Sequence, residues 1–137
     1  MVSKTVFLID SFALMAYLTG EAGGSRVQEL FAQSKDRKCR LLMNIINLGE
    51  VLYITERMRG LTMAQNVLAL VESLPLELVD AGRDLVLDAA HIKAKHALSY
   101  ADAFAAATAI RENAVIVTGD PEFKSIEQLT KIEWLIA

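Results

Sequence analysis

Four carboxylates stand at the edges of apolar segments along this chain, and side chains of this type can hold a metal cation. They occur in the stretches IDSF, NLGEV, YADAF and TGDP, and they are Asp10, Glu50, Asp102 and Asp120. Clustered carboxylates repel one another unless a cation binds them, and hard oxygen ligands suit Mg²⁺ or Mn²⁺ rather than zinc. Two such ions are a common device for cleaving a phosphodiester bond. The acids therefore indicate a metal-dependent nuclease.

Each acid also has an explanation that involves no metal. Asp10 and Asp120 each precede a predicted helical segment and would serve there as N-caps. Asp102 follows Ser99 by three residues, which is the spacing of a capping box. Glu50 would be a solvated helix residue. Caps are commoner than metal ligands, so no single acid decides between the two interpretations.

The composition predicts one globular domain that spans residues 1–137. Hydrophobic residues make up 53% of the chain, yet no apolar run reaches the ~18 residues of a membrane span, and no segment resembles a signal peptide. Cys39 is the only cysteine, which excludes an internal disulfide or a thiolate metal site. We therefore expect a cytoplasmic protein without membrane attachment. The net charge of −3 argues against non-specific wrapping of nucleic acid, but it does not exclude a nuclease whose metal ligands are acidic.

Short apolar segments alternate with segments of helical periodicity, which is typical of an α/β fold with a parallel sheet covered on both faces. The predicted strands are residues 5–9, 40–43, 76–79, 114–117 and 131–136. The predicted helices are residues 11–18, 27–33, 47–59, 62–73, 84–96 and 100–112. A capping box formed by Thr62 and Gln65 is expected to start the fourth of these helices.

This order of elements allows the four acids to meet. Ligands bind beyond the carboxyl ends of parallel strands, and Asp10 and Asp120 both come at or just after the end of a predicted strand. Asp102 lies in the first turn of an alanine-rich helix, which can approach its neighbours closely. Glu50 emerges between Ile46 and Ile54 on a mostly apolar helix face. Carboxylates held this close should have raised pKa values in a metal-free site.

The combination of these acids and their contexts resembles the PIN domain, and more closely the VapC-type toxins of prokaryotic toxin–antitoxin pairs. The matching pieces are FLIDSFAL, NLGEVLY, SYADAFAAATA and VIVTGDPEF, which cover both ends and the middle of the chain. The resemblance implies a three-layer α/β/α fold with a central parallel sheet. It also implies an endoribonuclease that depends on Mg²⁺ or Mn²⁺ and cleaves RNA phosphodiester bonds.

The resemblance further assigns roles to individual residues. The metal ligands that it implies are Asp10, Glu50, Asp102 and Asp120. Our mechanistic hypothesis takes Asp10 and Asp102 as the principal ligands, with Glu50 and Asp120 completing the shell or orienting water. Thr118 matches the hydroxyl of the T/S-x-D stretch and would support the site, and Ser11 matches the hydroxyl residue that often follows the first Asp. Family members often carry an Asp two residues after the last acid, where this chain has Glu122, and no role is assigned to Glu122.

Partners are also inferred from the resemblance. It implies an RNA substrate, a cognate antitoxin protein and a homodimer. The large apolar side chains of residues 48–58 and 63–70 either line a groove for such a partner or fill the protein's own core, and the sequence leaves both open.

Other function classes receive less support. A non-catalytic PIN-fold adaptor that binds RNA or protein would be favoured by loss of an acid, and all four remain. A phosphoacceptor domain would need an acid pair after the first strand and a late lysine, which the chain lacks. His91 and His96 do not have the i, i+4 spacing of a helical zinc pair. Tyr53 and Trp134 are expected to pack rather than to stack a base.

Overall fold

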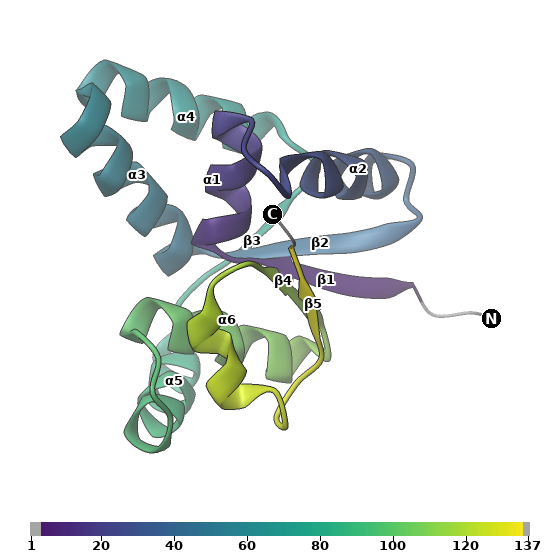
Figure 1. The fold of residues 1–137 in the computed structure, drawn as a ribbon, viewed down its shortest axis with the longest axis vertical. Helices are drawn as coiled ribbons and strands as arrows, with labels where there is room; N and C mark the ends of the chain where they lie inside the picture. Colours follow the sequence, from purple (N-terminus) through teal and green to yellow (C-terminus); the bar gives the residue numbers. More distant parts are fainter. Residues whose placement is uncertain (1–3, 136–137) are drawn as a thin grey trace.

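The computed structural model describes residues 4–135, in which a five-stranded sheet lies between two layers of helices (Figure 1). The strand order is β3-β2-β1-β4-β5, and every neighbouring pair is parallel. The strands are β1 Thr5–Ile9, β2 Cys39–Asn44, β3 Glu77–Val79, β4 Val115–Thr118 and β5 Ile132–Trp134. The predicted three-layer α/β/α fold with a central parallel sheet is confirmed. Ile136, which the prediction included in the last strand, lies outside the described residues.

Four helices cover one face of the sheet, and two helices with a short 3₁₀ helix cover the other (Figure 1). The first layer consists of α1 Ser11–Thr19, α2 Gly24–Lys35, α3 Ile45–Arg59 and α4 Leu61–Ser73. The second layer consists of α5 Arg83–Lys95, α6 Tyr100–Glu112 and the 3₁₀ helix η1 Pro121–Ile126. This division places Asp10, at the start of α1, and Glu50 of α3 on one side of the sheet. Asp102 of α6 and Asp120, at the start of η1, lie on the other side.

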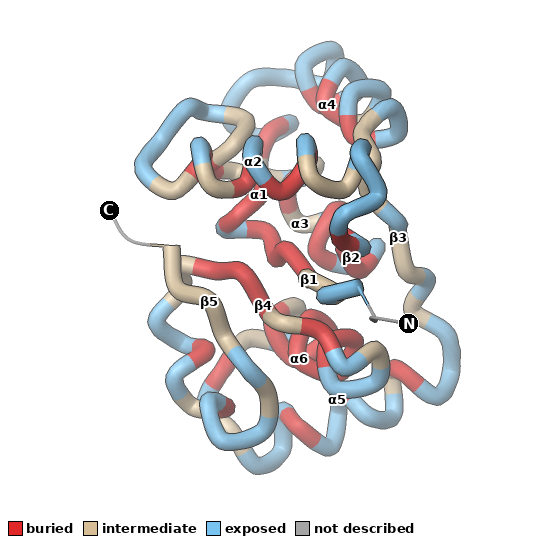
Figure 2. The backbone as a smooth tube through the Cα atoms, turned by 90° about the vertical axis from the view of Figure 1, so that its right-hand side faces the viewer, coloured by how far each residue is buried: buried red, intermediate tan, exposed pale blue. Residues whose placement is uncertain are grey.

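Alternation along the strands builds a separate core on each face. Leu8 and Ile116 pack with α5 and α6, whereas Ile9 and Val117, the next residue of each strand, pack with α1 to α4. The buried residues form a central band in which the strands, α1 and α6 meet (Figure 2). Residues 103–109 of α6 are all buried. The small alanine side chains of this stretch let α6 lie close to the sheet and to α5.

Two helix starts differ from the sequence prediction. Helix α3 begins at Ile45, two residues early, because the Asn44 side chain caps it and accepts a 2.8 Å hydrogen bond from the backbone N–H of Ile46. The capping box predicted for Thr62 is wrong. Helix α4 begins at Leu61, directly after Gly60, whose φ of 91° turns the chain between the two helices and leaves no place for a side-chain cap at residue 62.

The connections leave β1 and β4 in opposite directions. From β1 the chain passes through α1 and α2 to β2, and from β3 it passes through α5 and α6 to β4 on the other face. The carboxyl ends of β1 and β4 therefore form the point where the strand order reverses, which is where open α/β sheets bind ligands. None of the helices formed by residues 4–135 has the length and apolar character that a membrane crossing requires.

Candidate functional site

A cleft of about 350 Å³ opens where the strand order reverses. All four predicted acids line it, together with two acids to which the sequence assigned no role. The six are Asp10, Glu21, Glu50, Asp102, Asp120 and Glu122. The cleft lies at the carboxyl ends of the strands, between α1 and α3 on one side and α6 and η1 on the other. The structure thus gathers carboxylates from both helical layers into one space.

Asp10 is held by hydrogen bonds at both carboxylate oxygens. Its Oδ1 accepts a 2.9 Å hydrogen bond from the N–H of Ala13, and its Oδ2 accepts a 2.5 Å hydrogen bond from Oγ1 of Thr118. The first of these is the N-cap of α1, so the cap interpretation is confirmed. Only 1% of Asp10 is exposed, and this burial raises the pKa of its carboxyl to about 7 although both hydrogen bonds act to lower it.

Thr118 connects Asp10 to Asp120. While it donates to Asp10, its Oγ1 accepts a 3.0 Å hydrogen bond from the backbone N–H of Asp120. Asp120 in turn caps η1, since its Oδ1 accepts a 2.9 Å hydrogen bond from the N–H of Glu122. This chain of bonds orients two acids and the turn between them.

Asp102 has a buried oxygen that accepts no hydrogen bond from any of the described residues. Its backbone N–H donates to Oγ of Ser99 at 3.1 Å, which confirms Ser99 as the cap of α6. Its carboxylate does not complete a capping box, because among the described residues it accepts no hydrogen bond from the backbone N–H of Ser99, and its buried Oδ2 has no partner. Burial raises the pKa of Asp102 to about 8, and the nearby Asp120 carboxylate acts in the same direction. A buried carboxylate oxygen left unpaired is costly, so this geometry favours a bound cation.

Ser11 positions Glu50 on the opposite wall. Oγ of Ser11 donates a 2.5 Å hydrogen bond to Oε1 of Glu50 and lies 3.2 Å from the carbonyl oxygen of Asn47. The Asn47 side chain donates to the carbonyl of Ala101 at 3.0 Å, in the first turn of α6. Helices α1, α3 and α6 are therefore joined beside the cleft by polar contacts that the sequence did not reveal.

The tightest group of acids contains Glu122. Carboxylate oxygens of Asp102, Asp120 and Glu122 all lie within 4.8 Å of one another. Asp10 and Glu50 line the same cleft outside this group. The only indication of Glu122 in the sequence was its place two residues after Asp120, where the resemblance to the PIN domain implies an Asp. In the structure, the turn of η1 brings this acid back toward Asp120. A donor set of carboxylates alone fits a hard divalent cation such as Mg²⁺ or Mn²⁺.

Gly119 allows the ring of Phe12 to pack directly against the backbone at the cleft. A Cβ at this position would overlap the ring of Phe12, which lines the cleft from α1. The close approach of ring and backbone accounts for glycine between Thr118 and Asp120.

The predictions for the two histidines and for Trp134 and Tyr53 have different outcomes. The Nδ1 atom of His96 lies 3.0 Å from the carbonyl oxygen of Ser125, away from the acids, and His91 is exposed. Trp134 packs partly buried against the core beneath the sheet, as predicted. The prediction that Tyr53 packs is wrong, because 49% of its surface is exposed on α3.

Comparison with known proteins agrees with this architecture. The model of the PIN domain family matches residues 7–129. DNA-bound VapBC from Salmonella typhimurium is similar with a TM-score of 0.75 and 21% identity, covering 96% of this chain and 99% of that chain. VapBC2 from Rickettsia felis, bound to a promoter DNA fragment, has a TM-score of 0.73 and 20% identity, covering 94% and 98%.

A further similar structure is VapC20 from Mycobacterium tuberculosis, described as a sarcin–ricin loop cleaving toxin. Its TM-score is 0.69 at 20% identity, and the match covers 86% of this chain and 92% of that chain. At sequence identities this low, these structural similarities show a shared fold. No curated protein sequence gave a significant match.

Proposed function

The chain belongs to the PIN domain family, and from that premise we propose that it is an endoribonuclease dependent on Mg²⁺ or Mn²⁺, acting as the toxin of a toxin–antitoxin pair. The observation that carries the proposal is the convergence of carboxylate oxygens of Asp102, Asp120 and Glu122 within 4.8 Å of one another, together with a buried Oδ2 of Asp102 that has no hydrogen-bond partner among residues 4–135. An arrangement of this kind is unfavourable without a cation. It supports a metal site at the place where this fold binds its ligand.

In the proposed site, Asp102 and Asp120 hold the cation with Glu122, and Asp10 completes the ligand set from the end of β1. A divalent cation, when bound, supplies activation of water near neutral pH and neutralises the charge that builds on the attacked phosphate. Thr118 keeps Asp10 turned toward the cleft. Ser11 holds Oε1 of Glu50 on the facing wall, where the other carboxylate oxygen of Glu50 can orient the attacking water.

The proposed substrate is RNA, as the likeness to a sarcin–ricin loop cleaving toxin supports. An enzyme that cleaves cellular RNA acts where that RNA is, so we place the protein in the cytoplasm. Six acids around the cleft repel a polyanion, and this repulsion makes substrate binding depend on the cation.

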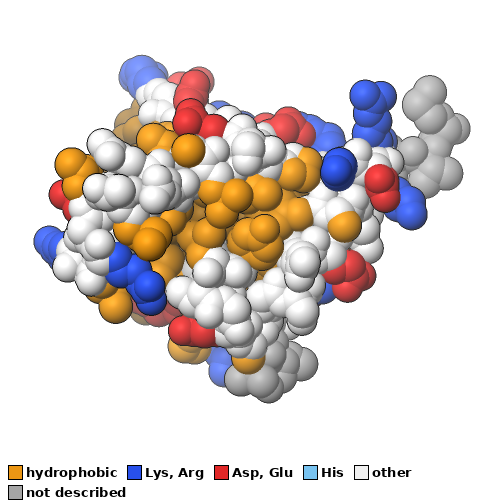
Figure 3. All heavy atoms as spheres, turned by 90° about the horizontal axis from the view of Figure 1, so that it is seen from above, with side chains coloured by type: hydrophobic (Ala, Val, Ile, Leu, Met, Phe, Trp, Pro, Cys, Tyr) orange, Lys and Arg blue, Asp and Glu red, His pale blue; other side chains and the backbone are white. Residues whose placement is uncertain are grey.

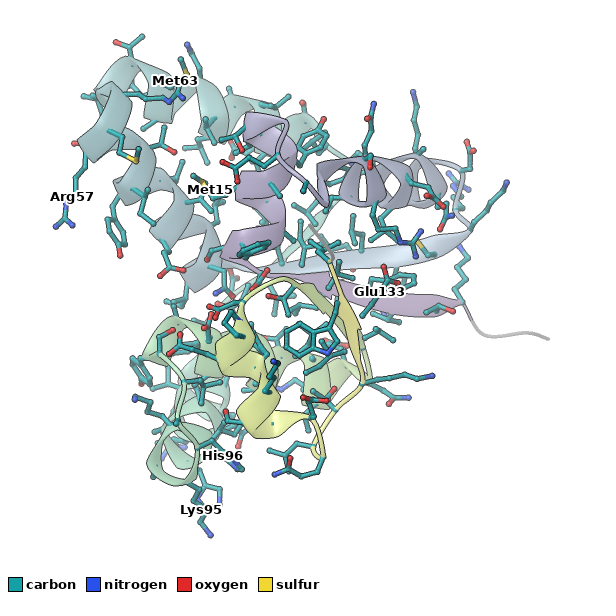
Figure 4. All side chains as sticks on the ribbon, viewed as in Figure 1. Met15, Arg57, Met63, Lys95, His96 and Glu133 are labelled. Carbon is teal, nitrogen blue, oxygen red and sulfur yellow. The ribbon has the colours of Figure 1, made fainter. Side chains whose placement is uncertain are left out.

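The proposed antitoxin has a binding surface available. A groove of about 610 Å³ lies between α1 and the α3–α4 hairpin, and Met15, Leu18, Met58, Met63 and Val67 contribute its apolar lining. Met15 and Met63 are labelled in Figure 4 on the two sides of this opening. Hydrophobic side chains also gather on the face above these helices (Figure 3). Two of the similar structures are VapBC assemblies, which supports a protein partner with apolar side chains here.

Residues 48–58 and 63–70 thus divide between core and surface. Leu48, Val51 and Val67 are buried, whereas Met58 is 74% exposed and Leu70 is 41% exposed. Homodimerisation is a further part of the proposal, taken from the family. The exposed apolar side chains of Leu87 and Ile110 on α5 and α6 are candidates for that contact.

The test is cleavage of a mixed, end-labelled RNA pool by the purified protein with Mg²⁺, Mn²⁺ or EDTA. Asp102→Asn and Asp10→Asn should abolish cleavage and preserve the fold. Asp84→Asn is the matched control, because the side chain of Asp84 is 84% exposed at the start of α5. This variant should cleave RNA like the wild type. Discrete metal-dependent cuts that vanish in EDTA and in both site variants would support the proposal. Full activity in the site variants would contradict it, and absence of both cleavage and a metal-induced rise in melting temperature would favour the non-catalytic adaptor.

A further inference from the structure

Helix α3 carries an exposed aromatic–cation pair next to the acidic cleft. Tyr53 is 49% exposed, and the guanidinium carbon of Arg57 lies 5.1 Å from the centre of its ring. Both residues are on the outer surface of the helix, where neither contributes to the core. Tyrosine is enriched at binding surfaces, because its ring is apolar while its hydroxyl can stay in water.

Tyr53 and Arg57 lie on the same side of α3 as the residues of this helix that line the cleft. Tyr53 and Arg57 follow Glu50 by three and seven residues, so they share its stripe along the helix. Ile54, on the same stripe, itself lines the cleft beside Glu50. At 1.5 Å per residue, Arg57 lies about 10 Å along the helix axis from Glu50. Figure 4 shows Arg57 at the outer end of α3, directed away from the body of the protein.

Arg57 retains its capacity to bind an anion. None of the ion pairs formed within residues 4–135 includes it, whereas Arg26, Arg40 and Arg111 are each paired with a carboxylate. Within the described part of the chain, the guanidinium of Arg57 contacts the ring of Tyr53, and the N–H groups at the edge of the guanidinium stay available to a phosphate. A cation at this distance offsets the repulsion that the acids exert on an approaching polyanion.

We propose that Tyr53 and Arg57 form a subsite for a single-stranded RNA segment next to the phosphate that is cut. An unpaired base stacks on the Tyr53–Arg57 platform, and the phosphate of that segment binds the guanidinium. The inference rests on the proposed ribonuclease function and adds a substrate requirement. Stacking needs a base that is free of pairing, so the enzyme prefers unpaired RNA on this side of the cut.

The test measures RNA binding and cleavage separately. Binding of a fluorescein-labelled single-stranded RNA is followed by anisotropy with Ca²⁺ in place of Mg²⁺, and cleavage is followed with Mg²⁺. The variants are Tyr53→Ala, Tyr53→Phe and Arg57→Ala. Lys38→Ala is the matched control, because Lys38 is an exposed cation directly before β2, at the edge of the sheet opposite the acids.

Tyr53→Ala and Arg57→Ala should each raise Kd and KM roughly ten-fold with kcat unchanged, as loss of one base-stacking or phosphate contact predicts. Tyr53→Phe keeps the ring and should restore binding. Arg57→Ala should also reduce the slope of log Kd against log salt concentration by about 0.7, which Tyr53→Ala should not do. On a fully base-paired RNA of the same sequence, Tyr53→Ala should bind like the wild type.

The outcomes separate this subsite from the nuclease proposal. If the wild type cleaves RNA and both Tyr53→Ala and Arg57→Ala have unchanged Kd and KM, the subsite is wrong and the ribonuclease stands. If the wild type binds RNA in a Tyr53-dependent way without cleaving it, the subsite stands and the ribonuclease fails. If Tyr53→Ala instead converts a dimer into a monomer on a sizing column, the pair belongs to a contact between two copies, and the subsite is overturned.

Discussion

Oγ1 of Thr118 donates a 2.5 Å hydrogen bond to Oδ2 of Asp10, joining the end of β4 to the end of β1 across 108 positions of sequence. Both residues are buried, and the same hydroxyl accepts from the backbone N–H of Asp120. The bond fixes the direction of one carboxylate and the start of the turn that carries two others. Thr118 therefore acts on the candidate metal centre without belonging to its carboxylate set.

Replacing Thr118 by valine should damage the site more than the fold. Valine has nearly the same shape but lacks the hydroxyl, so Asp10 loses its donor and the Asp120 N–H loses its acceptor. We expect Mn²⁺ affinity and RNA cleavage to fall by about 10- to 100-fold, the usual effect of removing a group that orients a metal ligand. Titration calorimetry with Mn²⁺ gives the affinity. Thr118→Ser should recover most of it, and equal affinity in the valine variant would contradict this role.

Glu122 should contribute directly to cation binding. Its carboxylate lies in the group formed with Asp102 and Asp120, and Glu122→Gln removes the charge while keeping the shape. We expect weaker Mn²⁺ binding and a smaller rise in melting temperature on adding the ion. Glu127→Gln, at an exposed acid just after η1, is the control and should behave like the wild type. If both variants bind the ion equally well, the tight group of three acids is not the metal centre.

The metal-free protein should lose stability as the pH rises. Folding raises the pKa of Asp10 to about 7 and that of Asp102 to about 8, from an ordinary value of 3.8. Between pH 4 and pH 8, the folded state therefore holds more protons than the unfolded state, so the free energy of unfolding decreases across this interval. Melting curves in EDTA at pH 5 and pH 8 measure the change.

Two controls accompany the pH experiment. Asp102→Asn cannot ionise at this position and should show a smaller decline between pH 5 and pH 8 than the wild type. Mn²⁺ should stabilise the wild type more at pH 8 than at pH 5, because protons compete with the cation for the same oxygens. A melting temperature that rises with pH in EDTA would mean that the buried acids are not protonated in the folded protein.

Two glycines should respond in opposite directions to alanine. At Gly24, a Cβ would lie 2.5 Å from the carbonyl oxygen of Ala16, so alanine must push α1 and α2 apart at a cost of about 1–3 kcal/mol. At Gly49, within α3, an added Cβ would have no atom within 4 Å. Alanine should therefore stabilise the helix by about 0.5–1 kcal/mol. Urea unfolding of both variants measures the two changes. Equal changes in the free energy of unfolding for the two variants would show that the contact with Ala16 does not exclude a side chain at Gly24.

The fold and the acid-lined cleft follow from local sequence patterns. Short apolar runs separated by helical periodicity allow a parallel sheet with covered faces, and such a sheet brings the ends of its strands to one edge. Asp10 and Asp120 could be placed on that edge because each is tied to a strand end. Ser99 marked the start of α6 and so placed Asp102 in its first turn. In each case, the information lies within a few residues of the acid.

Contacts between distant segments could not be predicted in the same way. Nothing near Ser11 indicates that it binds Glu50, 39 residues away, and the position of Glu122 two residues after Asp120 does not reveal that its carboxylate approaches that of Asp102. The exposure of Tyr53 also depends on which face of α3 meets the other helices. Local sequence determined the element types, their order and the four acids, since periodicity and capping act over one or two helical turns. Only tertiary structure decided which oxygens converge and which side chains remain exposed, because those distances depend on how the helices pack on the sheet.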